Sequence, residues 1–540
     1  MKLLFLGGAD EIGASCALLT VAGKRLLIDC GLRVNRSGPE ALPQLDRLEG
    51  FEDLDAVLVT HAHTDHTGSL PVLSRMFPDT PVYMTRPTRR LSEILLRDAV
   101  KIMSLHAEEG GSGDGPEPLY GDEDVDHLCS RIQTIEREQW VELFPDLRVY
   151  YWPAGHILGA CGIFIDTPEG LILFSGDLCM ANQRTVVGAR NPSLKPDFMV
   201  LEATYGDGLH PRRQEEERTL ANDVAEVIQR GGTALIPSFA LGRAQEVMLA
   251  LRDMQRSGAL PLKFPIYADG LVRTICDAYT DLLPYLPPQL QNFVAHSGMA
   301  IFWDDILRRA DSFTRLSLGG EPCCIISSSG MLSGGPSVHY AKRLLPGPQN
   351  AVFFTGYTDE ESPGRQLQTL QTGDTLTLDG EVVTVRCQVR KNNLSAHADQ
   401  GQLCQIVSWF QPKAIVLVHG RLAAIQALRQ KLVEKYLVYN PKTGDEIDLS
   451  EAPSWTTERK VQVLAETRER YPGTLSREGD DLVIRLDGSL ADSPVWQHYY
   501  APYRRVEAKF MGTRLTLKAV PEEDGAIPEP PTAPPPPPKE

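Results

Sequence analysis

The sequence predicts an α/β protein with more than one domain, and three observations support this. The chain has 540 residues, which is too long for a single hydrophobic core. Up to about residue 206, short apolar runs alternate with Gly-rich turns, which is typical of strands. From about residue 207, strand patterns alternate with helical patterns, as they do in βαβ units on a parallel sheet.

The individual elements follow from hydrophobic periodicity and turn residues. In the first region we expect strands at residues 3–6, 17–21, 25–29, 56–60, 81–84, 147–151, 162–166, 171–175 and 198–201, and helices at 87–106 and 124–133. In the second region we expect strands at 233–237, 323–326, 351–355 and 381–389, and helices at 242–254 and 328–344. A helix at 402–410 and a strand at 414–418 follow. The Gly- and acid-rich residues 107–118 are typical of a mobile loop.

The last part of the chain carries less information. We expect an accessory module at 446–520, with a helix at 458–469 and strands near 482–486 and 514–519. An aromatic and basic cluster in it either stacks on bases or, as we favour, packs against the main domain. The cluster consists of Trp496, Tyr499, Tyr500, Tyr503, Arg504 and Arg505. The Pro-rich residues 521–540 are typical of a disordered or polyproline II tail, which either recruits a protein partner or is a solvated end.

Composition limits the class of protein. No apolar run reaches the roughly 20 residues that span a bilayer, and the short apolar N-terminus is interpreted as a strand, not a signal peptide. The ten cysteines include no CxxC pair, which favours a reducing, cytoplasmic location. The net charge of −17 argues against a nucleic-acid binder. Part of that charge belongs to any metal site, however, and one local basic groove is enough to hold RNA.

The strongest motif is His61-Ala62-His63-Thr64-Asp65-His66, directly after the apolar strand at 56–60. Three imidazoles and a carboxylate so close together converge only if the loop curls, and zinc stabilises such a loop through bonds of about 2.0–2.2 Å. Asp65 allows the loop to serve a second metal ion, because carboxylate and imidazole both suit zinc.

Three further ligand-type residues come just after apolar strands: His156, Asp177 and His419. Taken singly, each is most simply a turn residue. Beside the motif at 61–66, they predict a metal site along one edge of stacked sheets.

This pattern resembles the metallo-β-lactamase fold, an αβ/βα sandwich. The resemblance implies two zinc ions per subunit. His61, His63 and His156 would bind one ion, Asp65, His66 and His419 the other, and Asp177 would bridge them. Asp29 would orient the ligand side chains without contacting the metal ions itself. The alternative is that Asp29 is an ordinary turn aspartate.

About 220 residues separate Asp177 from His397, a long insertion for this fold. Here the chain resembles the β-CASP family, in which a cap domain interrupts the lactamase-like domain, and within it the bacterial and archaeal relatives of the cleavage and polyadenylation specificity factor nuclease subunit. Glu202, His397 and His419 match the three additional family motifs. The resemblance implies a lactamase-like domain at 1–206 and 395–445, with a β-CASP domain at 207–394. A His at the last motif goes with RNA substrates in that family.

The resemblance implies a zinc-dependent ribonuclease. A hydroxide activated by the two metals would attack phosphorus, with Asp65 and Asp177 holding the metals. His397 would be the general acid, and Glu202 would fix its tautomer. We expect endonuclease action. The alternatives are a 5′–3′ exoribonuclease of the ribonuclease J type, a DNA nuclease, a small-molecule hydrolase and a catalytically dead scaffold subunit. A homodimer is left open, and no membrane contact is expected.

Two Ser- and Gly-containing turns inside the insertion are candidates for binding RNA phosphates. Both are expected where a strand gives way to a helix, whose N-terminal N–H groups suit phosphate. Simple helix capping is the alternative. The candidate residues are Arg243, Ser328, Ser329, Gly330 and Arg365.

Overall fold

A computed structural model of the chain describes residues 1–51, 53–109, 117–260, 262–311, 315, 317 and 322–451, and the backbone of four strands farther along. The chain divides into two compact units, Met1–Pro453 and Ser454–Glu540. In the second unit β23 (Gly473–Glu478) pairs with β24 (Asp481–Leu486), and β25 (Arg505–Met511) pairs with β26 (Arg514–Val520). The two strands expected there are thus confirmed. The expected helix at 458–469, the aromatic and basic cluster, the tail and most of the loop at 107–118 lie outside the described residues.

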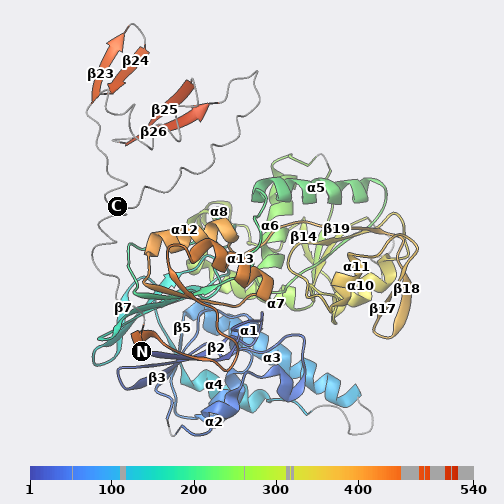
Figure 1. The fold of residues 1–540 in the computed structure, drawn as a ribbon. Coiled ribbons are helices and arrows are strands. Elements are labelled where there is room, and N and C mark those ends of the chain that lie inside the picture. Colours follow the sequence, from blue (N-terminus) through green and yellow to red (C-terminus); the bar gives the residue numbers. More distant parts are fainter. Residues whose placement is uncertain are drawn as a thin grey trace. The chain divides into compact units, whose positions relative to one another are not determined.

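Two seven-stranded sheets form the larger part of the first unit (Figure 1). The first has the order β22-β1-β2-β3-β4-β5-β6 and the second β21-β20-β11-β10-β9-β8-β7. The strands of the first sheet are β1 (Lys2–Gly7), β2 (Cys16–Val21), β3 (Lys24–Ile28), β4 (Ala56–Leu58), β5 (Val82–Met84), β6 (Ile132–Thr134) and β22 (Glu446–Asp448). Those of the second are β7 (Trp140–Phe144), β8 (Leu147–Pro153), β9 (Cys161–Thr167), β10 (Gly170–Phe174), β11 (Phe198–Glu202), β20 (Ala414–Val418) and β21 (Leu437–Tyr439).

The two sheets pack face to face, because side chains alternate along each strand. Leu3, Phe5 and Leu19 of the first sheet share a core with Ile163 and Val200 of the second. The opposite face of the first sheet packs against α2 (Leu70–Met76), α3 (Arg86–Glu109) and α4 (Asp122–Arg131). The opposite face of the second packs against α12 (Gln400–Phe410) and α13 (Leu422–Leu432). This arrangement confirms the αβ/βα sandwich.

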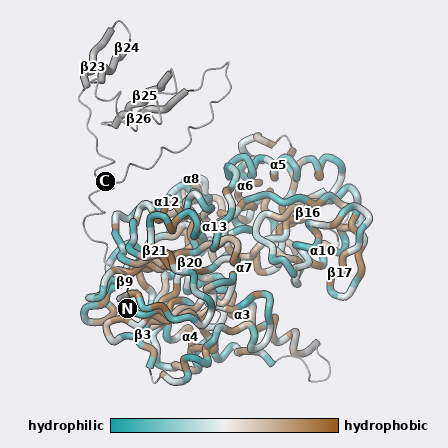
Figure 2. Tube along the Cα trace, viewed as in Figure 1, coloured by the Kyte–Doolittle hydropathy of each residue, from teal (hydrophilic) through white to brown (hydrophobic). Residues whose placement is uncertain are grey.

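The residues between β11 and β20 build a third sheet, with the order β14-β13-β15-β12-β16-β19. All its pairings are parallel, as expected. Its strands are β12 (Ala234–Pro237), β13 (Ile266–Asp269), β14 (Leu307–Arg309), β15 (Cys324–Ser327), β16 (Ala351–Phe354) and β19 (Gln388–Lys391). The helices described in this region include α5 (Arg213–Gln229), α6 (Arg243–Arg256), α7 (Leu271–Asp281), α8 (Pro288–Ser297), α10 (Pro336–Leu344) and α11 (Pro363–Leu367). Hydrophobic segments gather along the strands, whereas hydrophilic segments are frequent on outer helices such as α5 (Figure 2).

Two expected elements are wrong. The helix expected at 328–344 begins only at Pro336, because Gly334 and Gly335 have positive φ angles of 158° and 71° and Pro336 suits a first helical position. The strand expected at 381–389 is two strands. Its first part, β18 (Glu381–Thr384), forms a hairpin with β17 (Thr375–Leu378) through Asp379-Gly380, and β19 joins the parallel sheet. Both hairpin residues have positive φ, which is the conformation that an Asp-Gly turn favours.

The chain returns to the sandwich after the insertion. Strand β20 pairs in parallel with β11, and β22 pairs with β1. The boundaries at residues 206, 394 and 445 stay predictions. No helix in the described part of the chain is long and apolar enough to cross a membrane.

Candidate metal centre

The ligand-type residues gather where strands of the two sheets end. His61 follows β4, His156 follows β8, Asp177 follows β10 and His419 follows β20. Glu202 is the last residue of β11, beside β20. Because neighbouring strands end at the same edge, residues from distant parts of the chain meet there, and all five are buried.

The loop at 61–66 packs closely against the backbone of Gly31. The carbonyl oxygens of Asp65 and His66 accept hydrogen bonds from the N–H groups of Ser15 (2.9 Å) and Cys30 (2.8 Å). A Cβ on Gly31 would lie 1.7 Å from the Asp65 carbonyl oxygen, so only glycine permits this approach. On the other side, His419 takes a left-handed φ of 51° and donates its N–H to the Gly8 carbonyl at 2.7 Å.

A first group of ligand atoms consists of His61, His63, His156 and Asp177. Nδ1 of His63 lies 3.2 Å from Nε2 of His61 and 3.1 Å from Nε2 of His156. Oδ2 of Asp177 lies 3.5 Å and 3.6 Å from the same two Nε2 atoms. These atoms surround one point, as ligands of a single ion do.

A second group consists of Asp65, His66 and His419. The other carboxylate oxygen of Asp177, Oδ1, lies 3.5 Å from Nε2 of His66 and 3.7 Å from Nε2 of His419. Oδ2 of Asp65 lies 3.9 Å and 3.7 Å from these same Nε2 atoms. Asp177 therefore directs one carboxylate oxygen to each group, and its role as a bridge between two metal ions stays a prediction.

In His156, His419 and His66, the ring nitrogen that faces away from the ligand groups contacts another polar group. Nδ1 of His156 lies 2.8 Å from the Ala396 carbonyl, and Nδ1 of His419 lies 2.9 Å from the Ser15 hydroxyl. Asp29 acts on the loop at 61–66: its Oδ2 lies 2.8 Å from Nδ1 of His66, and its carboxylate accepts the N–H and hydroxyl of Thr60, both at 2.7 Å.

These outer contacts show that the site fits a cation. A carbonyl oxygen only accepts, so Nδ1 of His156 carries the proton and its Nε2 presents a lone pair. Nε2 of His63 lies 3.5 Å from the Leu241 carbonyl, so its Nδ1 presents a lone pair too. The two nitrogens that carry these lone pairs, Nε2 of His156 and Nδ1 of His63, lie 3.1 Å apart. In addition, Nε2 of His66 and Oδ1 of Asp177 are buried with no hydrogen-bond partner in the described part of the chain. Metal ions bound here would satisfy all four atoms.

The local charges point the same way. Burial and the neighbouring imidazoles lower the pKa of His61 and His156, which keeps these rings neutral and able to coordinate. Burial also acts to lower the pKa of His66, but Asp177, Asp29 and Asp65 raise it to about 10. The carboxylates thus create a field that favours positive charge.

Glu202 and His397 form a pair beside the first group. Nδ1 of His397 lies 3.1 Å from Oε2 of Glu202 and 3.9 Å from Oδ2 of Asp177. Glu202 also accepts the N–H of Leu178 at 2.6 Å and the hydroxyl of Thr204 at 2.5 Å. Burial acts to lower the pKa of His397, but Glu202 and Asp177 raise it to about 9.

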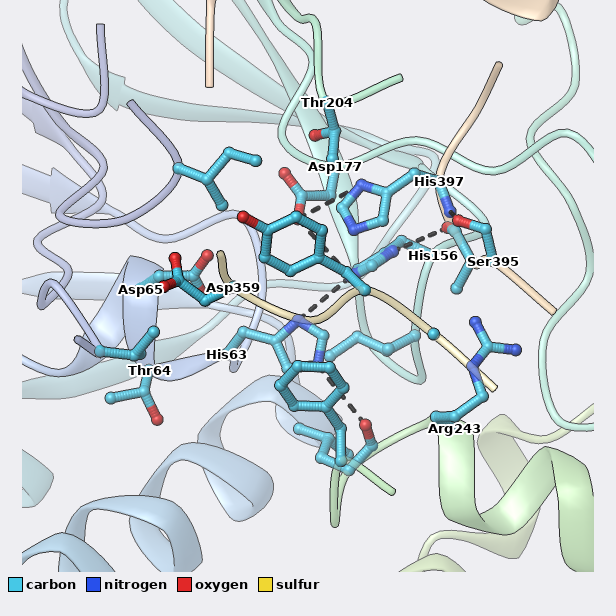
Figure 3. A pocket seen from close by; sticks show the side chains of 18 of the residues that line it. His63, Thr64, Asp65, His156, Asp177, Thr204, Arg243, Asp359, Ser395 and His397 are labelled. Carbon is cyan, nitrogen blue, oxygen red and sulfur yellow. Dashed lines mark hydrogen bonds and ion pairs between the residues drawn. The ribbon is translucent and has the colours of Figure 1, made fainter. Parts of the chain in front are cut away.

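A cavity of about 220 Å³ opens over this centre, between the sandwich and the third sheet (Figure 3). Figure 3 shows His63, His156 and His397 around Asp177, and Asp65 at the left of the view, opposite His397. The remaining wall includes apolar side chains and, from the third-sheet region, Arg243. This wall contains Ile12, Val34, Leu95, Ile157, Phe239, Leu241, Met331 and Tyr357.

The phosphate candidates are placed less uniformly. Arg243 lines the cavity and is the first residue of α6. Ser328 and Ser329 are in the turn before α10 and line none of the described cavities; the hydroxyl of Ser329 lies 3.2 Å from that of Ser333. Arg365 lies on α11, away from the cavity lining.

Sequence reasoning missed several residues that support the centre. Ser15 and Thr60 contact outer nitrogens of ligand imidazoles, and Thr204 holds Glu202. Thr60 and Thr204 offered a signal, since each is a hydroxyl residue next to a strand end that carries a candidate ligand.

Three family models match successive stretches of the chain. They are the metallo-beta-lactamase superfamily at residues 9–238, the Beta-Casp domain at 244–367 and the Zn-dependent metallo-hydrolase RNA specificity domain at 382–441. Together with the His and Asp cluster they support a divalent metal, for which zinc is the usual choice.

Named relatives match most of the chain. It is similar to the transcription termination factor FttA of Methanocaldococcus jannaschii, with 34% identity over 434 residues that span 78% of this chain and 67% of the relative. FttA of Thermococcus kodakarensis is 33% identical over 460 residues, 81% of this chain and 69% of the relative. The cleavage and polyadenylation specificity factor 73 of Drosophila melanogaster is 28% identical over 508 residues, 92% of this chain and 70% of the relative.

A solved structure agrees in fold alone. The crystal structure of a protein of unknown function from Enterococcus faecalis V583 has a TM-score of 0.50 at 14% identity, and the match covers 83% of this chain and 99% of that one. The order of the three matched regions and the identity to FttA over most of both chains agree with the sandwich, the inserted sheet and the metal cluster. The chain belongs to the β-CASP family of metallo-β-lactamase-fold proteins.

Proposed function

We propose that this protein is a two-zinc ribonuclease that hydrolyses internal phosphodiester bonds of RNA. The observation that carries the proposal is the shared position of Asp177, whose two oxygens face two separate ligand groups. This arrangement supports a two-metal hydrolytic centre, in which the two ligand groups would each hold one ion and Asp177 would contact both.

The donor set supports zinc. Both groups consist of imidazole and carboxylate, without thiolate, and each supplies three protein ligands besides the shared carboxylate. Such sets bind zinc while leaving a position for water or substrate. A bound pair of zinc ions supplies Lewis acidity and lowers the pKa of water to near neutrality.

The chain's own residues orient the proton transfer. Glu202 already accepts two hydrogen bonds as an anion, so Nδ1 of His397 donates its proton to Oε2 of Glu202. This contact fixes the ring, and it leaves Nε2 of His397 as the atom able to hold the proton that the leaving oxygen needs. We therefore assign His397 as general acid and Glu202 as the residue that positions it.

Three observations support RNA as the substrate. One matched model is described as an RNA specificity domain, and a relative is named as a cleavage and polyadenylation factor. The final motif position carries His419, which lies in the second ligand group. The inserted domain, moreover, forms one wall of the cavity and contributes the buried cation Arg243.

Metal analysis combined with four substrates tests the proposal: linear RNA, circular RNA, and linear and circular single-stranded DNA. We expect two zinc ions per chain and cutting of both RNA forms, with DNA left intact. Digestion of linear RNA from its 5′ end with circular RNA intact would establish an exonuclease instead. Cutting of DNA would refute RNA selectivity. A chain without zinc that cuts nothing would be a scaffold subunit.

A further inference from the structure

A small side chamber lies beside the metal-centre cavity, at the carboxyl edge of the third sheet. Its volume is about 10 Å³, roughly the space of one water molecule. Strands β12 and β16 end at its wall, with Ser238 and Thr355 as the residues that follow them. Phe239, Arg243, Gly356 and Tyr357 line both this side chamber and the main cavity, so the two spaces adjoin.

Three buried polar atoms at this chamber lack a hydrogen-bond partner in the described part of the chain. They are Oγ of Ser238, Nη1 of Arg243 and Oγ1 of Thr355. The three residues are 1%, 8% and 1% exposed, and all three line the chamber. Folded proteins satisfy the great majority of buried polar atoms, because leaving one unpaired costs about 1–3 kcal/mol. Three such atoms around one space indicate a ligand that accepts hydrogen bonds.

Within the described residues, the guanidinium of Arg243 makes no ion pair, although Glu246 on the same helix acts on it electrostatically. The nearest acid on its helix, Glu246, accepts the N–H groups of Arg184 and Thr185 and the Thr185 hydroxyl instead. Arg213, close by, adds positive charge: burial and this neighbouring guanidinium lower the pKa of Arg243 to about 10. A buried cation that makes no direct ion pair favours an anionic ligand.

The surrounding backbone holds the chamber in shape. The Ser238 N–H donates to the Ser327 carbonyl at 2.9 Å. A Cβ on Gly330 would lie 2.9 Å from the Phe239 nitrogen, so Gly330 allows its loop to close over Ser238. The chamber also lies where ligands of parallel α/β sheets bind, outside the carboxyl ends of the strands and at the start of a helix, α6.

We propose that the side chamber receives one non-bridging oxygen of a substrate phosphate, held by Arg243, Ser238 and Thr355, while the rest of that phosphate lies in the main cavity. A chamber of this size suits a single phosphate oxygen. This phosphate is distinct from the one hydrolysed at the metal centre. The proposal rests on the proposed function, since it makes these three residues a substrate-positioning subsite.

The test measures RNA binding without turnover. The full chain, loaded with zinc and carrying His397→Ala, is titrated with a short single-stranded RNA by fluorescence anisotropy at several salt concentrations. Added to this background, Arg243→Gln should weaken binding about tenfold and reduce the salt slope of log K by about 0.7, the contribution of one phosphate contact on a single strand. Arg256→Gln, at the other end of α6, is the matched control and should leave the slope unchanged.

Ser238→Ala and Thr355→Val add a second readout. Each should weaken RNA binding about fivefold, because a hydrogen bond to a charged oxygen is lost. Neither should lower the Tm of the RNA-free protein, because each removes a buried hydroxyl that has no partner there. Hydroxyls with a purely structural role would lower Tm without changing RNA affinity, which overturns the proposal.

The bound phosphate is either an internal phosphodiester or a 5′-terminal phosphate of the RNA. Three RNAs of the same sequence distinguish the two: one with a 5′-phosphate, one with a 5′-hydroxyl and one circularised. If the phosphate is internal, the variants lose the same affinity for all three RNAs, and if it is terminal, they lose affinity only for the 5′-phosphorylated strand. If the chamber holds water only, affinity and salt slope stay unchanged in every variant and the proposal fails. Binding is measured apart from cleavage, so this result is independent of whether the wild-type protein cuts RNA.

Discussion

Oε2 of Glu202 lies 3.1 Å from Nδ1 of His397, and the Glu202 carboxylate at the same time accepts hydrogen bonds from Leu178 and Thr204. Three donors on one buried carboxylate fix its position and keep it ionised. Nδ1 of His397 lies closer to this carboxylate, at 3.1 Å, than to the nearest oxygen of the ligand Asp177, at 3.9 Å. The proton-transfer role proposed for His397 predicts that its loss leaves metal binding intact, and mutation can test this.

His397→Ala should retain both zinc ions and lose turnover about 10²- to 10⁴-fold, the range of a general acid. Zinc content is measured by atomic emission and turnover on linear RNA. His339→Ala, on α10 outside the cavity lining, serves as the control and should behave as wild type. Loss of zinc together with activity would contradict the assignment.

Asp65→Ala and Asp177→Ala should differ in stoichiometry. Asp65 belongs to one ligand group, so its removal should leave one zinc ion per chain. Asp177 faces both groups, so its removal should release both ions. Both variants should be inactive, and the metal count after dialysis is the measurement. Equal stoichiometry in the two variants would show that Asp177 does not bridge.

Asp29→Asn should weaken zinc binding about 10- to 100-fold, because the Asp29 carboxylate contacts His66 and also fixes Thr60 at the start of the ligand loop. Competition with a chelator of known affinity gives the zinc Kd. Asp79→Asn, whose side chain is 92% exposed, should not change it. An unchanged Kd in Asp29→Asn would reduce Asp29 to an ordinary turn residue.

Gly31→Ala should destabilise the protein by about 4 kcal/mol or more and release zinc, because the new Cβ would meet the backbone of Asp65 at 1.7 Å. Gly50→Ala has open space at the corresponding position and should stay within about 0.5 kcal/mol. Urea denaturation with metal analysis compares the two. A Gly31→Ala variant as stable as Gly50→Ala would show that the loop shifts without difficulty.

Asp269 provides a pH-dependent test of the third sheet. Burial acts to raise the pKa of Asp269, but hydrogen bonds from Arg315, Tyr340 and the Gly270 N–H hold it below the ordinary value. Since the folded pKa is depressed, the carboxylate stabilises the fold above the ordinary pKa of about 3.9, and this contribution is lost as pH falls through the folded pKa. Asp269→Asn should therefore be less stable than wild type by about 3 kcal/mol at pH 7.

The difference between wild type and Asp269→Asn should remain constant from pH 7 to about pH 5 and shrink below about pH 4. Comparing the two chains cancels the effect of acid on the metal centre, which is the same in both. Urea unfolding at each pH gives the difference. A gap that persists unchanged below pH 4 would show that the charge of Asp269 does not stabilise the fold.

Much of the sandwich could be predicted because its strands are continuous apolar runs bounded by glycine. Strand β10, for example, was expected at 171–175 and is found at Gly170–Phe174. The sequence could indicate which candidate ligands lie together, because each stretch that carries them follows such a strand and parallel neighbours bring side chains together there.

The other features of the fold and the site depend on backbone conformations and long-range contacts that no local sequence pattern predicts. The helix expected from Ser328 fails because Gly334 and Gly335 adopt left-handed or extended positive-φ conformations that interrupt the periodicity. The partner of His419 is Ser15, about 400 positions away along the chain, and only the folded sheets place them together. The side chamber is similarly hidden, because Ser238 and Thr355 follow different strands.

Strand β20 lies between β11 and β21, and it delivers His419 only after the whole inserted domain has been made. During synthesis, the edge of β11 that pairs with β20 therefore stays unpaired until β20 has been made. The second ligand group is likewise incomplete until His419 has been added, whereas the first is complete in the chain at Asp177. The inserted domain therefore sets the order in which the two ligand groups can be assembled during synthesis.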